Sequence, residues 1–295
     1  MLQILLDRCR ALPPLPTAVV HPCDAASLDG ALLAARQGLI TPILVGPEAR
    51  IRAAADGAGL DLTGIEIVAT PHSHASAEAA VALVGQGRAG ALMKGSLHTD
   101  ELLSAALARD AGLRTERRVS HAFVMDAPLY PRLLIITDAA VNIAPDLEAK
   151  ADIIRNAIRL AGAIGIDLPR VAILSAVETV TPKLTSTLDA AALCKMADRG
   201  QIMGGILDGP LAFDNAVSEA AAKAKGIVSG VAGRADILVV PDIESGNMLA
   251  KQLALLGGAE SAGIVLGLRV PVALTSRSDD ATSRLASAAL LRLTA

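Results

Sequence analysis

Aromatic side chains are nearly absent from this chain of 295 residues, which has no tryptophan, one tyrosine and two phenylalanines. Proteins that hold single-stranded nucleic acid stack the bases on aromatic rings and line the strand with basic residues. This chain has few rings, no long basic run and a net charge of -3. We therefore expect no nucleic-acid partner, and an adenine group that binds here must rest on aliphatic side chains and polar edges.

Cysteine is also scarce and widely spaced. Cys9, Cys23 and Cys194 form no C-x-x-C pair, so the sequence predicts neither a disulfide framework nor a zinc site. The pair His72 and His74 follows a proline in a loop and has no third ligand at a suitable spacing. We interpret these two histidines as capping or solvent-facing residues and expect no metal site.

Long apolar runs are missing, although hydrophobic residues make up 52% of the chain. Charges and turn residues interrupt every run before the roughly 18 residues that a membrane helix requires, so we expect no membrane partner. The first ten residues, MLQILLDRCR, place charges directly after a short apolar stretch, which is not the order of a signal peptide. The cytoplasm is the expected location.

Two familiar nucleotide-binding motifs are absent or out of context. The chain has no G-x-x-x-x-G-K-[ST] sequence, which excludes a P-loop. Residues 85–90 match G-x-G-x-x-G, but they follow a helical pattern and precede a strand, so we interpret them as a helix end and a turn.

His98 and His121 lack the Ser or Cys partner pattern of a catalytic triad and are interpreted as structural histidines.

What the chain does contain is an alternation of short Val/Ile/Leu runs with Ala-rich segments of helical spacing. This pattern predicts an α/β fold of two lobes, with mostly parallel sheets and helices on both faces, and 295 residues exceed one typical core. Residues 119–125 and 133–137 depart from the alternation and predict an antiparallel pair. Pro145 marks the start of a long helix.

The most informative stretch lies near the C-terminus. The apolar strand predicted at residues 270–274 ends in Thr275, Ser276 and Arg277, where the next helix should begin. Ligands of α/β proteins bind at such strand ends, because the helix N-terminus offers free N–H groups and the positive end of its dipole. The planar guanidinium of Arg277 suits a phosphate or a carboxylate, so this stretch predicts an anion site.

Other predicted strands end in polar residues as well, and helix capping is the competing interpretation at each of them. Asp279 and Asp280 precede the last helix, where aspartate is a common cap, so capping and a functional role both stay open there. The remaining strand ends carry Lys94 with Thr99 at an expected N-cap, Gly209 with Asp214, and the run Ser245, Gly246 and Asn247 that is expected to open a helix.

Several sequence blocks resemble one enzyme family in the same order along nearly the whole chain. They are LITPILVG (39–46), AGALMKGSLHTDELL (89–103), GPLAFDNAV (209–217) and the long block VAGRADILVVPDIESGNMLAKQL, followed by AGIVLGLRVPVALTSRSDD. Together they resemble the phosphate acetyltransferase and phosphate butyryltransferase family. The residues of the block AGALMKGSLHTDELL and of the C-terminal block look closer to the butyryltransferase branch of the family than to the acetyltransferase branch.

This resemblance implies a specific architecture and reaction. It implies an isocitrate/isopropylmalate dehydrogenase-like arrangement with an active-site cleft between lobes, the first formed by residues 1–140 plus 276–295 and the second by 141–275. It also implies reversible transfer of a short-chain acyl group between coenzyme A and inorganic phosphate, giving an acyl phosphate. Coenzyme A is then a substrate, neither a metal, a tightly bound cofactor nor a covalent intermediate is needed, and a homodimer is expected.

The resemblance also suggests roles for residues. We assign Arg277 to the phosphate oxygens, Ser276 to the reacting carbonyl, and Asp279 or Asp280 to the proton of the thiol. In the acetyltransferase branch the proposed catalytic aspartate falls where this chain has Ser283, which leaves the identity of the base open. The expected substrate and coenzyme A contacts are Lys94, Thr99, Gly209, Asp214, Ser245, Gly246 and Asn247.

Two alternatives from other classes stay open at this point. The first is a metal- and nicotinamide-dependent dehydrogenase of related fold, against which the lack of an Asp or His cluster counts. The second is a non-catalytic module that binds coenzyme A or an acyl phosphate. The acyl group is also open, because acetyl, propionyl and butyryl differ by single methylenes, each worth roughly 1 to 3 kcal/mol in a fitted pocket.

Overall fold

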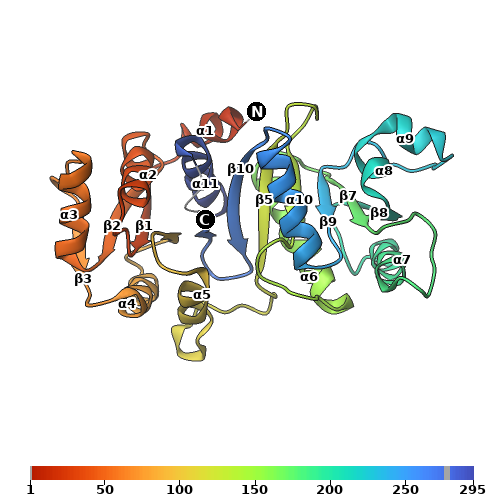
Figure 1. Cartoon of the computed structure of the whole chain (residues 1–295). Coiled ribbons are helices and arrows are strands. Elements are labelled where there is room, and N and C mark those ends of the chain that lie inside the picture. The colour runs from red at the N-terminus through yellow and green to blue at the C-terminus, as the bar shows by residue number, and fades with distance from the viewer. Residues whose placement is uncertain (1, 276–279) are drawn as a thin grey trace. The chain divides into compact units, whose positions relative to one another are not determined.

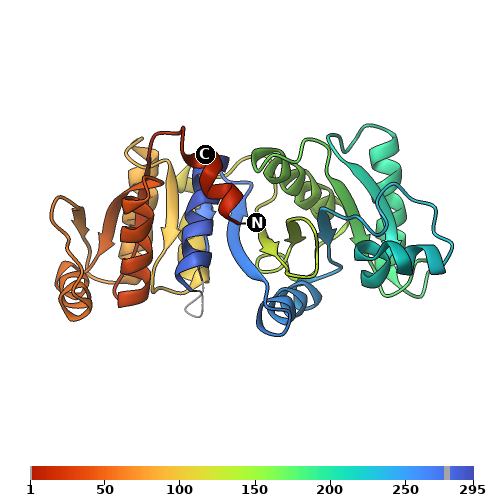
Figure 2. The same ribbon diagram turned by 90° about the horizontal axis from the view of Figure 1, so that it is seen from above.

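The computed structural model describes residues 2–275 and 280–295, which form two compact units (Figure 1). The terminal unit contains residues 3–117 and 262–295 (Figure 2), and the middle unit contains residues 118–261 together with Leu2. These boundaries differ from those of the lobes expected from the sequence, which were placed after residues 140 and 275. The expected lobes stay a prediction.

In the terminal unit the strands have the order β3-β2-β1-β4-β11-β10. All neighbours are parallel except β10 and β11, which are antiparallel. Because β2 and β4 flank β1 on opposite sides, the strand order reverses between β1 and β4, which makes this pair a topological switch point. The strands are β1 (Leu15–Val20), β2 (Ile40–Gly46), β3 (Glu66–Ala69), β4 (Ala91–Lys94), β10 (Glu260–Leu266) and β11 (Val272–Ala273).

The helices of the terminal unit cover both faces of its sheet. Right-handed crossovers put the helices that lead from β1 to β3 on one face and the helix that returns to β4 on the other. Accordingly α2 packs against α3 and α11, whereas α4 packs against α5 (Figure 1). The helices are α1 (Gln3–Cys9), α2 (Ala25–Arg36), α3 (Glu48–Ala58), α4 (Ser73–Gly85), α5 (Thr99–Leu107), the 3-10 turn η1 (Arg109–Ala111) and α11 (Ala281–Thr294).

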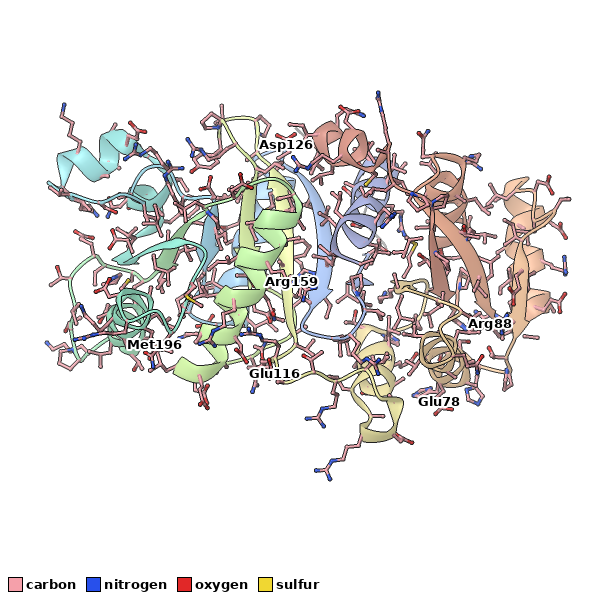
Figure 3. The ribbon with its side chains drawn as sticks, turned by 180° about the vertical axis from the view of Figure 1, so that it is seen from behind. Glu78, Arg88, Glu116, Asp126, Arg159 and Met196 are labelled. Carbon is pink, nitrogen blue, oxygen red and sulfur yellow. The ribbon has the colours of Figure 1, made fainter. Side chains whose placement is uncertain are left out.

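The middle unit has the strand order β5-β6-β9-β7-β8. The pair β5 and β6 is antiparallel and the other pairs are parallel, which confirms the antiparallel pair predicted from the sequence. Helix α10 lies on one face of this sheet and α6, which carries the labelled Arg159, on the other (Figures 1 and 3). The elements are β5 (Ser120–Asp126), β6 (Leu134–Thr137), α6 (Leu147–Ala163), β7 (Arg170–Leu174), α7 (Thr185–Asp198), β8 (Ile206–Leu211), α8 (Phe213–Val217), α9 (Glu219–Ala224), β9 (Ile237–Val239) and α10 (Ile243–Leu255).

Aliphatic and small side chains build the cores, as the scarcity of aromatic residues requires. In the middle unit the core gathers residues such as Met125, Ile136 and Leu238, while Phe123 and Tyr130 are only partly buried against it. Each large aliphatic side chain contributes about 1.5–3 kcal/mol by its burial. The predicted α/β class, with mostly parallel sheets covered on both faces, is confirmed. Within the part of the chain that the structure describes, no helix is long and apolar enough to cross a membrane.

Candidate functional site

The switch point of the terminal unit is where Lys94 ends β4. Its side chain is only 7% exposed, and Nζ lies 3.4 Å from the carbonyl oxygen of Gly95. Gly95 is required here, because an added Cβ would lie 2.5 Å from the carbonyl oxygen of Val20 at the end of β1. Ser96 then donates its backbone N–H and its hydroxyl to the carbonyl of His21, at 2.9 and 2.8 Å. The chain after β4 is thus fixed against the chain after β1.

His21 follows β1 with a backbone φ of 56°, a left-handed conformation that non-glycine residues adopt uncommonly. The ring is buried, and its Nδ1 lies 3.1 Å from Oγ of Ser76. Burial, assisted by the guanidinium of Arg50, lowers the pKa of His21 below its usual value. This conformation turns the His21 carbonyl toward Ser96 and so helps to hold the strand ends together. No pattern in the sequence predicts the left-handed conformation of His21.

A second buried cation lies close to the end of β11. Thr275, which follows this strand, donates its hydroxyl to the carbonyl of Lys94 at 3.1 Å. Arg284 of α11 is 7% exposed, and its Nη1 lies 3.5 Å from the Thr275 hydroxyl oxygen. Two buried cationic residues therefore contact Thr275, Lys94 through its backbone carbonyl and Arg284 through its guanidinium. The sequence interpretation missed Arg284, because it assigned roles only to the residues that precede this helix and to the position of Ser283.

The predicted catalytic residues are only partly within the described chain. Ser276, Arg277 and Asp279 lie outside the described residues. Asp280 is the N-cap of α11, and its carboxylate accepts a hydrogen bond from the backbone N–H of Ser283 at 2.8 Å. The capping interpretation of Asp280 is therefore confirmed, and this does not test a catalytic role.

Thr99 occupies a slightly different position from the expected one. Helix α5 begins at Thr99, and the N-cap is His98, whose side chain makes no capping hydrogen bond. The prediction of Thr99 as the cap was therefore wrong by one residue. Lys94 is the last residue of β4, and Thr99 is half-buried in the first turn of the next helix.

The predicted contacts Ser245, Gly246 and Asn247 lie inside the first turn of α10 and do not open it. Asp242 is the N-cap, because its carboxylate accepts from the backbone N–H of Ser245 at 2.8 Å and from its hydroxyl at 2.7 Å. Asn247 donates its side-chain amide to the carbonyl of Ala139 at 3.2 Å. A Cβ on Gly246 would lie 3.2 Å from Cα of Ala139, so this helix turn packs tightly on the loop after β6.

That loop is organised by Asp138, whose carboxylate is 2% exposed and accepts five N–H groups. Oδ1 accepts from the backbone of Ala140 and Val141, each at 2.9 Å. Oδ2 accepts from the backbone of His121 at 3.1 Å and of Asn142 at 3.3 Å, and from the Asn142 side chain at 2.5 Å. Burial lowers the pKa of His121 to about 4, although the Asp138 carboxylate opposes this shift. His121 is thus buried and neutral, as a structural histidine should be.

Gly209 and Asp214 have structural contacts of their own. Gly209 lies within β8, where an added Cβ would approach the carbonyl oxygen of Ile173 to 2.7 Å. Asp214 lies in α8, and its carboxylate is 3.7 Å from Nζ of Lys225 and accepts the backbone N–H of Asn215 at 2.9 Å. Their expected roles in substrate binding stay predictions.

The described residues, 2–275 and 280–295, contain no group of three or more His, Cys, Asp or Glu side chains that could hold a metal ion. His72 is the N-cap of α4, and its Nδ1 accepts the backbone N–H of Ala75 at 3.2 Å, which confirms its interpretation as a capping residue. His74 lies 3.8 Å from the carboxylate of Glu101. These two histidines therefore have contacts within the fold.

The fold and the strand ends define an α/β protein that buries two cationic residues, Lys94 and Arg284, near the ends of β4 and β11. The sequence gives the family: residues 69–291 match the model described as "Phosphate acetyl/butaryl transferase". The chain belongs to this phosphate acetyl/butyryl transferase family, as its sequence blocks predicted, and it is an enzyme of the transferase class.

Individual relatives agree with this assignment. The chain is 62% identical to a phosphate acetyltransferase of Rhizobium meliloti over 98% of this chain and 92% of the relative. It is 43% identical to a phosphate butyryltransferase of Clostridium acetobutylicum over 94% of this chain and 92% of the relative. A branched-chain phosphotransacylase from Enterococcus faecalis has a similar structure, with a TM-score of 0.82 and 30% identity over 95% of this chain and 99% of that one. The identity to the acetyltransferase exceeds that to the butyryltransferase, the branch to which the short blocks looked closer.

Proposed function

We propose that the chain catalyses reversible transfer of a short-chain acyl group between coenzyme A and inorganic phosphate. The observation that supports this proposal most is the pair of buried cations, Lys94 and Arg284, at the strand ends of a protein that belongs to the phosphate acetyl/butyryl transferase family. Phosphate carries at least one negative charge at neutral pH, and cationic side chains held in a buried site bind such a group strongly. The products are an acyl phosphate and coenzyme A.

The proposed transfer is direct. A phosphate oxygen attacks the thioester carbonyl, a C–O bond forms, the C–S bond breaks, and the thiolate of coenzyme A leaves and takes up a proton. A cysteine nucleophile is disfavoured, because burial raises the pKa of Cys9 and Cys23, and that of Cys194 to about 12. Their thiolates are therefore scarce at neutral pH.

Specific residues are proposed for each part of this reaction. Arg277 binds phosphate or acyl-phosphate oxygens, Ser276 donates to the carbonyl oxygen as negative charge develops, and Asp279 or Asp280 handles the thiol proton. Lys94 supplies positive charge at the end of β4. The other proposed substrate or coenzyme A contacts are Thr99, Gly209, Asp214, Ser245, Gly246 and Asn247.

We further propose acetyl as the preferred acyl group, since the 62% identical relative is named a phosphate acetyltransferase. The enzyme is proposed to act in the cytoplasm as a homodimer, with no resident cofactor. Two-fold dimers are the commonest closed assemblies of soluble proteins. Sedimentation equilibrium would test the assembly, and the mass of a monomer would overturn it.

The decisive assay follows phosphate-dependent release of coenzyme A from acetyl-, propionyl- and butyryl-CoA, with EDTA present. We expect turnover that is fastest with acetyl-CoA and that is retained in EDTA. Arg277→Ala serves as the control, with an expected loss of about a hundredfold or more in kcat/KM. A folded wild-type protein that releases no coenzyme A from any of the three thioesters would overturn the proposed function.

A further inference from the structure

Arg284 is unusual among the buried residues of α11. The other buried side chains of this helix are Ser283, Ser287, two leucines and three alanines, all small or apolar. Arg284 is 7% exposed, and a guanidinium is expensive to bury. An apolar side chain of similar volume would often be as stable or more stable at a position that serves packing alone. Burial of this charge indicates that the charge itself has a use.

The surroundings of Arg284 hold its guanidinium at the carboxyl end of β11. Thr275 gives its hydroxyl proton to the carbonyl of Lys94, so its oxygen lone pairs face Nη1 of Arg284, 3.5 Å away. On the other side, Gly30 of α2 makes room for the stem of the arginine, since an added Cβ would lie 2.8 Å from Cδ of Arg284. Three elements, α2, α11 and the end of β11, thus set the position of one cationic group.

We infer that Arg284 binds the phosphate substrate, contributing its guanidinium to the same oxyanion that Lys94 attracts. This inference rests on the proposed function and adds to it a residue that determines affinity for inorganic phosphate. The planar fork of an arginine can donate two parallel hydrogen bonds to phosphate oxygens, which a lysine cannot reproduce. Phosphate groups of coenzyme A share this chemistry, so the experiment includes both ligands.

The test is calorimetric titration of the purified protein with inorganic phosphate and, separately, with coenzyme A. Arg284→Met keeps the length of the stem and removes the charge, and we expect its Kd for phosphate to rise about tenfold to a hundredfold, with little change for coenzyme A. Arg284→Lys should lie between Met and the wild type. Arg292→Met is the matched control, because Arg292 lies near the other end of the same helix and donates to the carbonyl of Pro13 at 2.6 Å; phosphate affinity should be unchanged.

A second variant keeps the arginine and moves it. Gly30→Ala forces Cδ of Arg284 to shift, so the Kd for phosphate should rise even though the charge is present. If Arg284→Met does not fold, the Kd of Gly30→Ala for phosphate tests whether Arg284 binds phosphate. Phosphate affinity equal to the wild type in Gly30→Ala and in every folded Arg284 variant would overturn the inference, and so would a loss confined to coenzyme A.

The titration also separates this inference from the proposed function. A wild-type protein that binds phosphate through Arg284 but releases no coenzyme A would refute the proposed function and support the binding role. A wild-type protein that turns over normally, with Arg284→Met binding phosphate equally well, would retain the function and refute the binding role.

Discussion

The two units use buried charge in opposite ways at the ends of their strands. In the terminal unit the charges are positive: Lys94 and Arg284 lie around Thr275, at the ends of β4 and β11. In the middle unit the charge is negative: Asp138 follows β6 and accepts five N–H groups from the loop and from β5.

We propose that this difference separates a structural charge from a binding charge. A carboxylate that accepts so many hydrogen bonds within its own unit has its charge balanced by the fold, and its loss should affect stability. Cations gathered at a topological switch point are placed where α/β proteins bind ligands, and their loss should affect affinity for an anion.

The largest expected effect is on stability, from Asp138→Ala. Removing the carboxylate leaves buried N–H groups of the loop and of His121 without their acceptor, and we expect the free energy of unfolding to fall by about 3–5 kcal/mol. Denaturant titration followed by circular dichroism measures it. The control is Asp198→Ala, which removes an exposed ion pair with Lys195 and should change stability by less than about 1 kcal/mol. Equal effects of the two variants would contradict a structural role for Asp138.

The next effect is a dependence of stability on pH that comes from His121. Its pKa is about 4 in the folded protein, below the ordinary histidine value of 6.5, so the unfolded chain binds a proton more readily between these values. The contribution of His121 to the free energy of unfolding is complete above pH 6.5 and is lost as the pH falls toward 4. The loss at pH 5 is about 2 kcal/mol. We expect His121→Gln to be less stable at every pH but to lose about 2 kcal/mol less between pH 7.5 and pH 5. An unchanged pH dependence in this variant would show that His121 is not the responsible group.

A smaller effect is expected from Lys94→Met, and it should appear in phosphate binding. The variant removes a buried positive charge, so the KM for phosphate should rise about tenfold, which corresponds to about 1.4 kcal/mol. The thermal unfolding temperature should stay close to that of the wild type, because the methionine fills most of the same space. A large loss of stability with an unchanged KM for phosphate would mean that Lys94, like Asp138, has a structural role. It would contradict the proposed difference between the two units.

The fold was predictable because local patterns and tertiary structure agree. The apolar runs that became β5 and β6 were found nearly in full, since paired strands demand Val, Ile and Leu. Boundaries were less certain at helix starts. The run Ser245 to Asn247 has the composition of a cap, yet Asp242 caps α10, because a proline directly before an aspartate already ends the strand.

The candidate site was predictable only where polar residues follow a strand in the sequence. Lys94 and Thr275 meet that condition, and the structure brings them together. Arg284 does not, because it lies one turn inside a helix and reaches the strand end through space. Its only signal was a charged residue on a face that is otherwise small and apolar. His21 was missed because a positive φ at a non-glycine residue leaves no trace in composition.

The smallest expected effect comes from Asp280→Asn, which sharpens the assignment of the base. Asparagine caps helices as well as aspartate does, so the contact with Ser283 and the stability of α11 should be retained while the charge is lost. We expect turnover within about threefold of the wild type for Asp280→Asn and a loss of about a hundredfold for Asp279→Asn, since general acid–base catalysis contributes at least that factor. The comparison uses kcat at saturating acetyl-CoA and phosphate. A loss in Asp280→Asn alone would move the role to the capping aspartate, and full turnover in both variants would mean that the thiolate of coenzyme A leaves without a carboxylate.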